Sequence, residues 1–143
     1  MKIHQRAGWI YYVGNVDQFK FDDMGKWMYF FKPEQLDFVS EKCAYVVEKG
    51  LIAEAKHTDK VVLNIKKSGV ACFYIDFDDK ETHKKLLNYF LANDMIPKTK
   101  VGIYNNIPFK LDSQTLAKEY GKNFTPKLSL EDFLDLSTGQ WKI

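Results

Sequence analysis

The sequence predicts a single α+β domain over residues 1–143, in which a largely antiparallel sheet is backed by two or three helices. Three observations predict this class. With 143 residues and 45% hydrophobic content, the chain can bury one core. Strand patterns outnumber helical patterns, and several follow one another directly, which is typical of antiparallel pairing. A ferredoxin-like split βαβ is the simplest such topology, because a strand–helix–strand unit occurs twice.

Glycine and proline mark the elements of the first third of the chain. Residues 8–14 form a short apolar run between two glycines and predict a strand. Residues 15–25 are polar and predict a loop, whereas the aromatic run 26–31 predicts a strong strand. Residues 33–50 predict a helix, because apolar residues recur at helical spacing between an initial proline and a final glycine.

The middle of the chain predicts three strands and a second helix. Residues 51–59 alternate between apolar and polar side chains, and 60–67 can form another strand. Residues 69–77 are the clearest buried strand in the sequence. A helix follows over 78–92, because an aspartate stands at its start and its leucines and phenylalanine form one buried stripe.

The last third predicts a strand pair and a short helix. Residues 99–105 and 107–112 are expected to pair around an Asn-Asn turn. Residues 128–136 predict a terminal helix with Ser129 as its cap. We find no repeats or linkers, which favours one domain.

The basic residues limit the kind of anion site that the chain can build. The net charge is only +2, which does not demand a nucleic acid partner. Arg6 is the only arginine among 21 basic residues. A site with two arginine forks is therefore excluded, and an anion must be held by lysine, backbone N–H groups, tyrosine or histidine.

The two cysteines predict no disulfide framework and no metal site. Cys43 and Cys72 lie among apolar neighbours, so we expect buried thiols. No Cys/His metal spacing and no cofactor motif occurs, so we predict neither a metal nor a cofactor. No signal-like start or apolar run of membrane length is present, which predicts a soluble, cytoplasmic protein with no membrane partner.

Strand alternation predicts a polar face on the sheet. It separates Lys56 from His57 within 51–59, and it puts Lys110 and Asp112 on one face of their strand. If the apolar faces pack under helices, Lys56 and Lys110 share the open face and can form a phosphate pocket. The alternative is that both lysines are only solvated.

Histidine and tryptophan supply further candidates. His57 is the best-placed histidine for proton transfer, although a structural role is the alternative. His83 borders a buried helical stripe and is expected to be structural. A tryptophan can stack on a base or belong to the core. The candidates for stacking are Trp9, Trp27 and Trp141.

Four fragments occur in the order found in a known family: GKW at 25–27, AKHT at 55–58, CFYIDFDD at 72–79 and FKLDSQTLAKEYG at 109–121. They resemble the family of the basophilic-leukaemia-expressed protein, also labelled phosphothreonine-lyase-domain proteins. The resemblance covers residues 25–121. That family is similar in fold to the cap-binding translation initiation factor. It implies a curved antiparallel sheet, backed by helices, with a ligand cleft on the concave face.

The resemblance also implies roles for particular residues. Lys110 would end a strand, and Asp112, Thr115 and Tyr120 would line the rim of the cleft. Arg6 and Trp27 are further candidates for ligand binding.

A phosphothreonine lyase removes phosphate by β-elimination and needs a base, a phosphate clamp and an acid. Lys56 or Lys110 would serve as base and clamp, because neighbouring ammonium groups lower the pKa of a lysine. His57 or Tyr120 would be the acid. Members of that class use arginines for the phosphate, and here only Arg6 exists.

Three functions from different classes are consistent with these observations. The first is binding of a phosphorylated small molecule or nucleotide in a cleft lined by lysine, tyrosine and tryptophan. The second is an enzyme on the same cleft, either a lyase or a phosphoesterase. The third is an interaction module without a small ligand, such as a bacterial accessory or phage protein that docks on a host protein.

Overall fold

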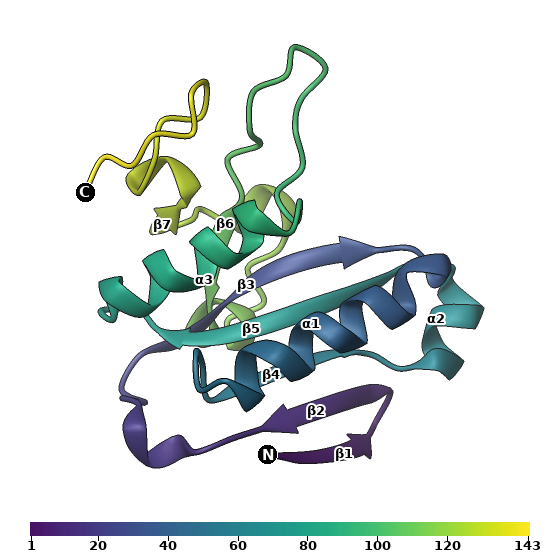
Figure 1. Ribbon diagram of the computed structural model, residues 1–143. Coiled ribbons are helices and arrows are strands. Elements are labelled where there is room, and N and C mark those ends of the chain that lie inside the picture. The colour runs from purple at the N-terminus through teal and green to yellow at the C-terminus, as the bar shows by residue number, and fades with distance from the viewer.

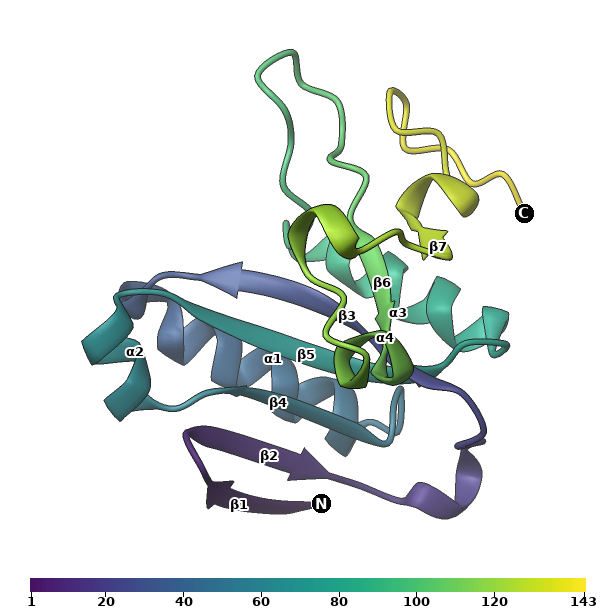
Figure 2. The ribbon, with the colours of Figure 1, turned by 180° about the vertical axis from the view of Figure 1, so that it is seen from behind.

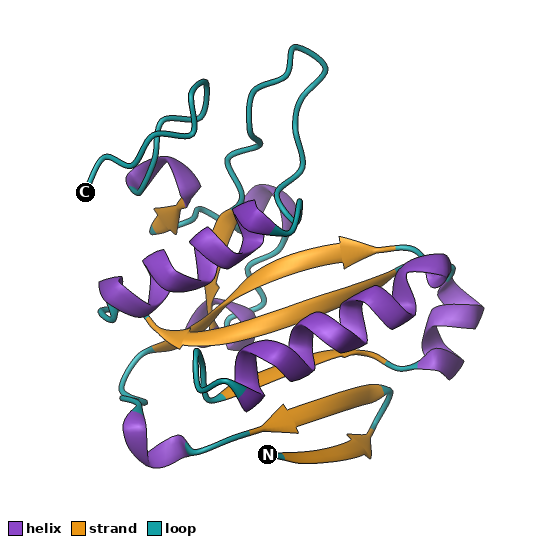
Figure 3. Cartoon of the chain, in the orientation of Figure 1, coloured by secondary structure: helices purple, strands orange, loops and turns teal.

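The computed structural model describes residues 1–143 and has the predicted α+β class. A curved, unclosed antiparallel sheet carries helices on one face (Figures 1 and 3). Its strand order is β1-β2-β4-β5-β3-β6-β7. The strands are β1 (Lys2–Arg6), β2 (Trp9–Val13), β3 (Met24–Phe31), β4 (Glu54–Thr58), β5 (Gly69–Asp76), β6 (Pro108–Leu111) and β7 (Leu128–Ser129). The helices are α1 (Leu36–Glu48), α2 (Lys60–Lys66), α3 (Lys80–Ala92) and α4 (Asp112–Leu116).

The centre of the sheet is the split βαβ arrangement that the element order predicted. The first unit is β3-α1-β4, and β5 lies between its two strands. The second unit is β5-α3-β6, and β3 lies between its two strands. The β1–β2 hairpin extends this core beyond β4, and β7 extends it beyond β6. The seven-stranded sheet is therefore a ferredoxin-like core with an added strand pair at one edge and a short strand at the other.

Residues 60–67 form the helix α2, so the prediction of a strand there is wrong. Asp59 caps this helix, because its Oδ1 accepts the N–H of Val62 at 2.9 Å. The helix ends at Lys67, which takes the left-handed conformation with φ 61°. The β-branched apolar residues favoured a strand in the prediction. The Asp59 cap and the left-handed conformation of Lys67 favour a helix, and they decide the local structure.

The predicted strand pair at 99–105 and 107–112 does not form. Lys98 and Tyr104 make only an isolated bridge, and the segment between them projects as a long loop (Figure 1). The strand β6 pairs instead with β3 and β7. The strand β6 thus lies between β3 and β7, and long-range pairing takes the place of the local hairpin.

The terminal helix predicted over 128–136 is also wrong. Leu128 and Ser129 form β7, and only a single 3₁₀ turn follows over Leu130–Asp132. The cap at Ser129 exists, because the Asp132 carboxylate accepts the Ser129 N–H at 2.8 Å. The Leu130 N–H donates to the carbonyl of Ile107, and this hydrogen bond holds the segment to β6.

The N-terminal strand β1 is absent from the predicted elements. It pairs with β2 through a turn in which Ala7 and Gly8 have φ values of 51° and 88°. Two successive positive φ values are typical of the tight turns that join hairpins. The polar sequence of β1 hides it, because every residue of this edge strand is exposed.

The core lies between the sheet and the helices α1 and α3. Trp27 of β3 is completely buried there, and its indole N–H donates to His83 Nδ1 at 2.9 Å. His83 Nε2 donates in turn to the carbonyl of Phe77 at 3.0 Å, which fixes the tautomer of the ring. Burial lowers the pKa of His83. His83 therefore has the structural position that the sequence predicted.

Candidate ligand-binding face of the sheet

The face of the sheet away from α1 and α3 gathers three lysines from three strands. Lys56 lies on β4 opposite Tyr11 of β2. Lys26 lies on β3, where it pairs with Tyr74 of β5 on one side and Lys110 of β6 on the other. This face is seen in Figure 2, where α4 lies across it near β6. Lys56 and Lys110 therefore share the open face, as strand alternation predicted.

Lys56 and Lys110 do not meet directly. Their strands are separated by β5 and β3, so their backbones are at least about 14 Å apart at the usual strand spacing. Lys26 stands between them and lowers the pKa of both. In place of a direct lysine pair, the open face thus carries a row of three, and we call Lys26, Lys56 and Lys110 the lysine cluster.

Aromatic rings surround the ammonium group of Lys56. The Nζ atom lies 4.0 Å from the centre of the Trp9 ring, 5.6 Å from Tyr11 and 5.8 Å from Tyr74. Burial lowers the pKa of Lys56, and the charge of Lys26 acts in the same direction. The rings attract the cation while they exclude water from it.

Lys26 connects the sheet to α4. Its Nζ donates to the Thr115 hydroxyl at 3.1 Å and to Asp112 Oδ1 at 3.5 Å. Asp112 and Thr115 therefore lie at the margin of the lysine cluster, where the resemblance implied a rim. The Lys26 ammonium retains one further N–H donor for a ligand, because a lysine carries three and two are used here.

Lys110 is covered by the segment that follows α4. Its Nζ lies 3.9 Å from the centre of the Tyr120 ring and 5.1 Å from that of Phe124. Burial lowers the pKa of Lys110, with a further contribution from Lys26. Tyr120 remains exposed above it, which places this residue at the expected rim.

Carboxylates compensate part of the charge of the cluster. Glu54 lies on β4 opposite Tyr74, on the same face as Lys56. Burial raises the pKa of Glu54, whereas the nearby Lys56 opposes that shift. Three ammonium groups stand beside the carboxylates of Glu54 and Asp112, so this part of the face offers an excess of cationic donors.

His57 does not face the lysine cluster, and its assignment as the acid there is wrong. Its ring is buried on the helix side, where Nε2 bonds to the Tyr12 hydroxyl at 3.0 Å and to Ser40 at 3.3 Å. Nδ1 donates to the carbonyl of Thr58 at 2.8 Å. Neighbours on a strand point to opposite faces, and so Lys56 and His57 cannot share a site.

Trp27 differs from its predicted role, whereas Arg6 lies on the open face. Trp27 has no exposed surface, so the prediction that it stacks on a ligand is wrong. Arg6 lies on the edge strand β1, opposite Trp9, and its side chain shares the open face. Two strand spacings, about 10 Å, separate β1 from β4, and the role of Arg6 in ligand binding stays a prediction.

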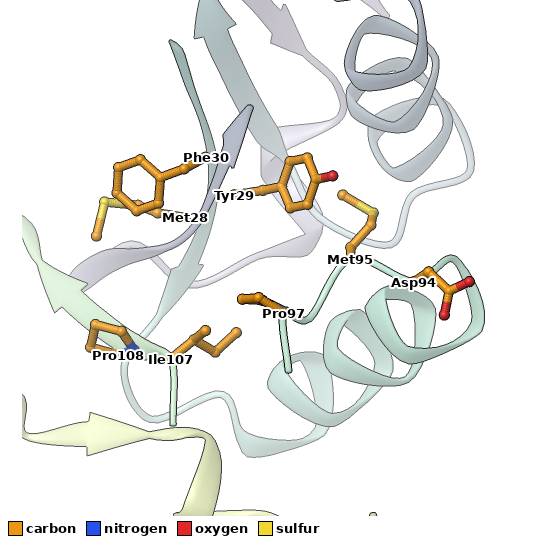
Figure 4. Close-up of a pocket in the computed structure, with 8 residues that line it drawn as sticks. All are labelled: Met28, Tyr29, Phe30, Asp94, Met95, Pro97, Ile107 and Pro108. Atoms are coloured by element: carbon orange, nitrogen blue, oxygen red, sulfur yellow. The ribbon is translucent and has the colours of Figure 1, made fainter. Parts of the chain in front are cut away.

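One cavity, of about 340 Å³, lies away from the lysine cluster at the edge of β3. It opens where β6 no longer pairs with β3, and Met28, Tyr29 and Phe30 line its strand side. Figure 4 shows these side chains facing Met95, Pro97, Ile107 and Pro108 across the cavity. A second cavity, of about 380 Å³, lies between the β1–β2 turn and α2 and includes Trp9.

Comparisons of the chain with protein-family models, with curated proteins and with solved structures found no match. The resemblance to the phosphothreonine-lyase-domain family therefore stays a prediction. No helix of the structure combines the length and apolar character that a membrane crossing needs. No group of three or more His, Cys, Asp or Glu side chains is arranged to hold a metal ion.

Proposed function

We propose that the protein binds a phosphorylated small molecule or nucleotide on the open face of its sheet. The observation that carries the proposal is the row of three lysines, in which Lys26 lies between Lys56 and Lys110. Their ammonium groups are partly removed from water by aromatic rings, which strengthens an ionic hydrogen bond to a phosphate. A phosphate dianion would also relieve the repulsion among the three cations.

A second candidate is β-elimination or phosphoester hydrolysis on the same face. The lowered pKa of Lys56 favours it, because a lysine must lose its proton to act as a base. With His57 on the opposite face, Tyr120 next to Lys110 is the remaining candidate for the acid. Binding is the better-supported function, since it needs only the cationic groups that lie together.

The test of the proposal is the variant Lys56→Met, which removes the ammonium but keeps an unbranched side chain of similar length. Binding of nucleotides, cyclic dinucleotides and phosphothreonine peptides is measured by thermal shift and calorimetry. A charge-assisted hydrogen bond contributes about 1.5–3 kcal/mol, so we expect the variant to bind roughly tenfold to a hundredfold more weakly. Mass spectrometry of the same samples detects loss of phosphate.

The matched control is Lys85→Met. Lys85 lies on α3, on the opposite side of the sheet, and its ion pair with Glu81 is exposed. Its replacement should leave binding unchanged. Equal losses in both variants, or no binding to the wild type, would contradict the proposal and favour an interaction module that docks on a host protein. Phosphate release that Lys56→Met abolishes would favour the enzyme.

The affinity for a phosphorylated ligand should fall with rising pH earlier than an ordinary lysine site would allow. Only the charged lysine holds the anion, and the pKa values of Lys56 and Lys110 are both lowered. Calorimetry between about pH 7 and 10 should show this decline together with proton uptake on binding. Lys56→Met should reduce both. A constant affinity over that range would show that neither lysine holds the ligand.

The proposal includes a cytoplasmic location. Cys43 and Cys72 are both free and buried. Burial raises the pKa of Cys72 to about 11, so its thiol stays protonated and unreactive. Two reduced cysteines are consistent with a reducing compartment.

A further inference from the structure

A cavity of about 380 Å³ adjoins the lysine cluster at one end of the open face. Four strands contribute to its base in a row. Trp9 of β2 lies opposite Thr58 of β4, and Phe30 of β3 lies opposite Val70 of β5. The side chains across the sheet are thus large on β2, small on β4 and β5, and large on β3. The rings of Trp9 and Phe30 therefore flank the smaller side chains of Thr58 and Val70. The helix α2 closes the end with Val62.

Trp9 belongs both to this cavity and to the lysine cluster. Its ring lines the cavity, and the Lys56 ammonium lies 4.0 Å from the centre of the same ring. Lys56 is two residues from Thr58 along β4, about 7 Å at the usual rise of a strand. Lys26, opposite Tyr74, stands about 13 Å from the level of Val70. The cavity and the lysine cluster are therefore neighbours on the open face, with the Trp9 ring between them.

The walls of the cavity suit a flat ring better than a charged group. Phe30 is 71% exposed, and it lies on the part of β3 that β6 does not cover. Trp9, Val62 and Val70 add apolar surface, and a large exposed aromatic beside a cavity is typical of a ligand wall. The Thr58 hydroxyl is already used, because it accepts the Val70 N–H at 3.0 Å. Ser68 and Lys66 supply free polar groups at the margin.

We propose that this cavity binds the base of a nucleotide whose first phosphate is held by Lys56 and whose further phosphates reach Lys26. The inference rests on the proposed function and narrows its ligand from phosphorylated molecules in general to nucleotides. A base that stacks on Phe30 or Trp9 directs the sugar along β4 toward Lys56. Further phosphates then extend toward Lys26. The aromatic surface and the cations lie in the order in which a nucleotide carries its base and its phosphates.

The experiment compares ligands with and without a base. Calorimetry measures the binding of AMP, GMP, CMP and UMP, and of ribose 5-phosphate, which carries the same anion alone. We expect at least one nucleotide to bind at least tenfold more tightly than ribose 5-phosphate. Phe30→Ala should remove most of that difference and leave ribose 5-phosphate unaffected, because stacking on one aromatic ring contributes roughly a factor of ten. Since Phe30 is largely exposed, this variant should fold normally.

Two further variants keep the interpretation clear. Phe21→Ala removes an exposed phenylalanine that does not line the cavity and should change neither ligand. Ser68→Trp fills the cavity from its margin and should weaken only the nucleotides. Equal binding of nucleotides and ribose 5-phosphate to the wild type would overturn the base site while leaving the proposed phosphate site intact. Failure of both ligand classes to bind would overturn both.

Discussion

Replacing His83 by alanine should lower the free energy of unfolding by about 4 kcal/mol. The imidazole is completely buried between the sheet and α3. Its loss leaves a cavity, and it also leaves the indole N–H of Trp27 and the carbonyl of Phe77 without their partner. A buried polar group that loses its partner costs about 1–3 kcal/mol in addition to the cavity. Chemical denaturation monitored by far-ultraviolet circular dichroism measures the change.

Two conservative variants separate the contributions. His83→Asn keeps an oxygen near the position of Nδ1 and can still accept from Trp27, so it should be less destabilised than the alanine variant. The longer side-chain amide of His83→Gln instead reaches toward the carbonyl of Phe77. If all three variants lost the same free energy, the two hydrogen bonds would not be the source of the stability.

The same residue predicts how stability depends on pH. Burial lowers the pKa of His83 below the ordinary value of 6.5, and His57 is shifted in the same direction. The unfolded chain therefore binds more protons than the folded one as the pH falls through this region, so stability decreases below about pH 6.5. The decrease should be smaller in His83→Asn, with the remainder contributed by His57.

Strand alternation predicted the faces of the central strands, because helices cover only one side of the sheet. It put Lys56 and Lys110 on the open face, where the structure has them. The same rule puts His57 on the opposite face. Its assignment as an acid beside Lys56 followed the suitability of histidine for proton transfer and not the rule.

Lys26 was missed because residues 27–31, which follow it, are all aromatic or apolar and so hide the alternation of the strand. The burial of Trp27 fixes the phase of the strand and forces Lys26 to the open face. No local pattern reveals that β6 leaves its predicted partner to pair with β3. A site assembled from three strands depends on that long-range pairing, and so only its parts could be predicted.

The strand predicted in place of α2 is the opposite kind of error. A local helix signal was present in the sequence, but the prediction gave it less weight than the β-branched composition. Val61 and Ile65 are exposed, so the apolar run did not mark a buried strand. Asp59 stands directly before it and supplies the cap that a helix needs. The β-branched composition outweighed the cap in the prediction, whereas in the fold the cap and the contacts of α2 with β5 prevail.

Gly25→Ala should destabilise the protein by about 3 kcal/mol, although it adds a single methyl group. Gly25 faces Leu111 across the β3–β6 pair and points toward the helices. A Cβ there would overlap Phe109 Cε2 and would lie 2.8 Å from the carbonyl oxygen of Lys110. Phe109 is buried and the carbonyl belongs to the ladder, so neither can move without cost. Thermal and denaturant unfolding measure the loss.

The variant pair Gly25→Ala and Phe109→Leu tests this cause. Leucine lacks the ring atoms that lie closest to the new methyl group, so the double variant should be less destabilised than the sum of the single ones. Additive losses would mean that the ring is not the obstacle. Because Lys110 follows Phe109 directly, Gly25→Ala should also displace this lysine from Lys26 and weaken phosphate binding. Three successive residues, Gly25, Lys26 and Trp27, thus provide close strand packing, a cation of the lysine cluster and an anchor in the core.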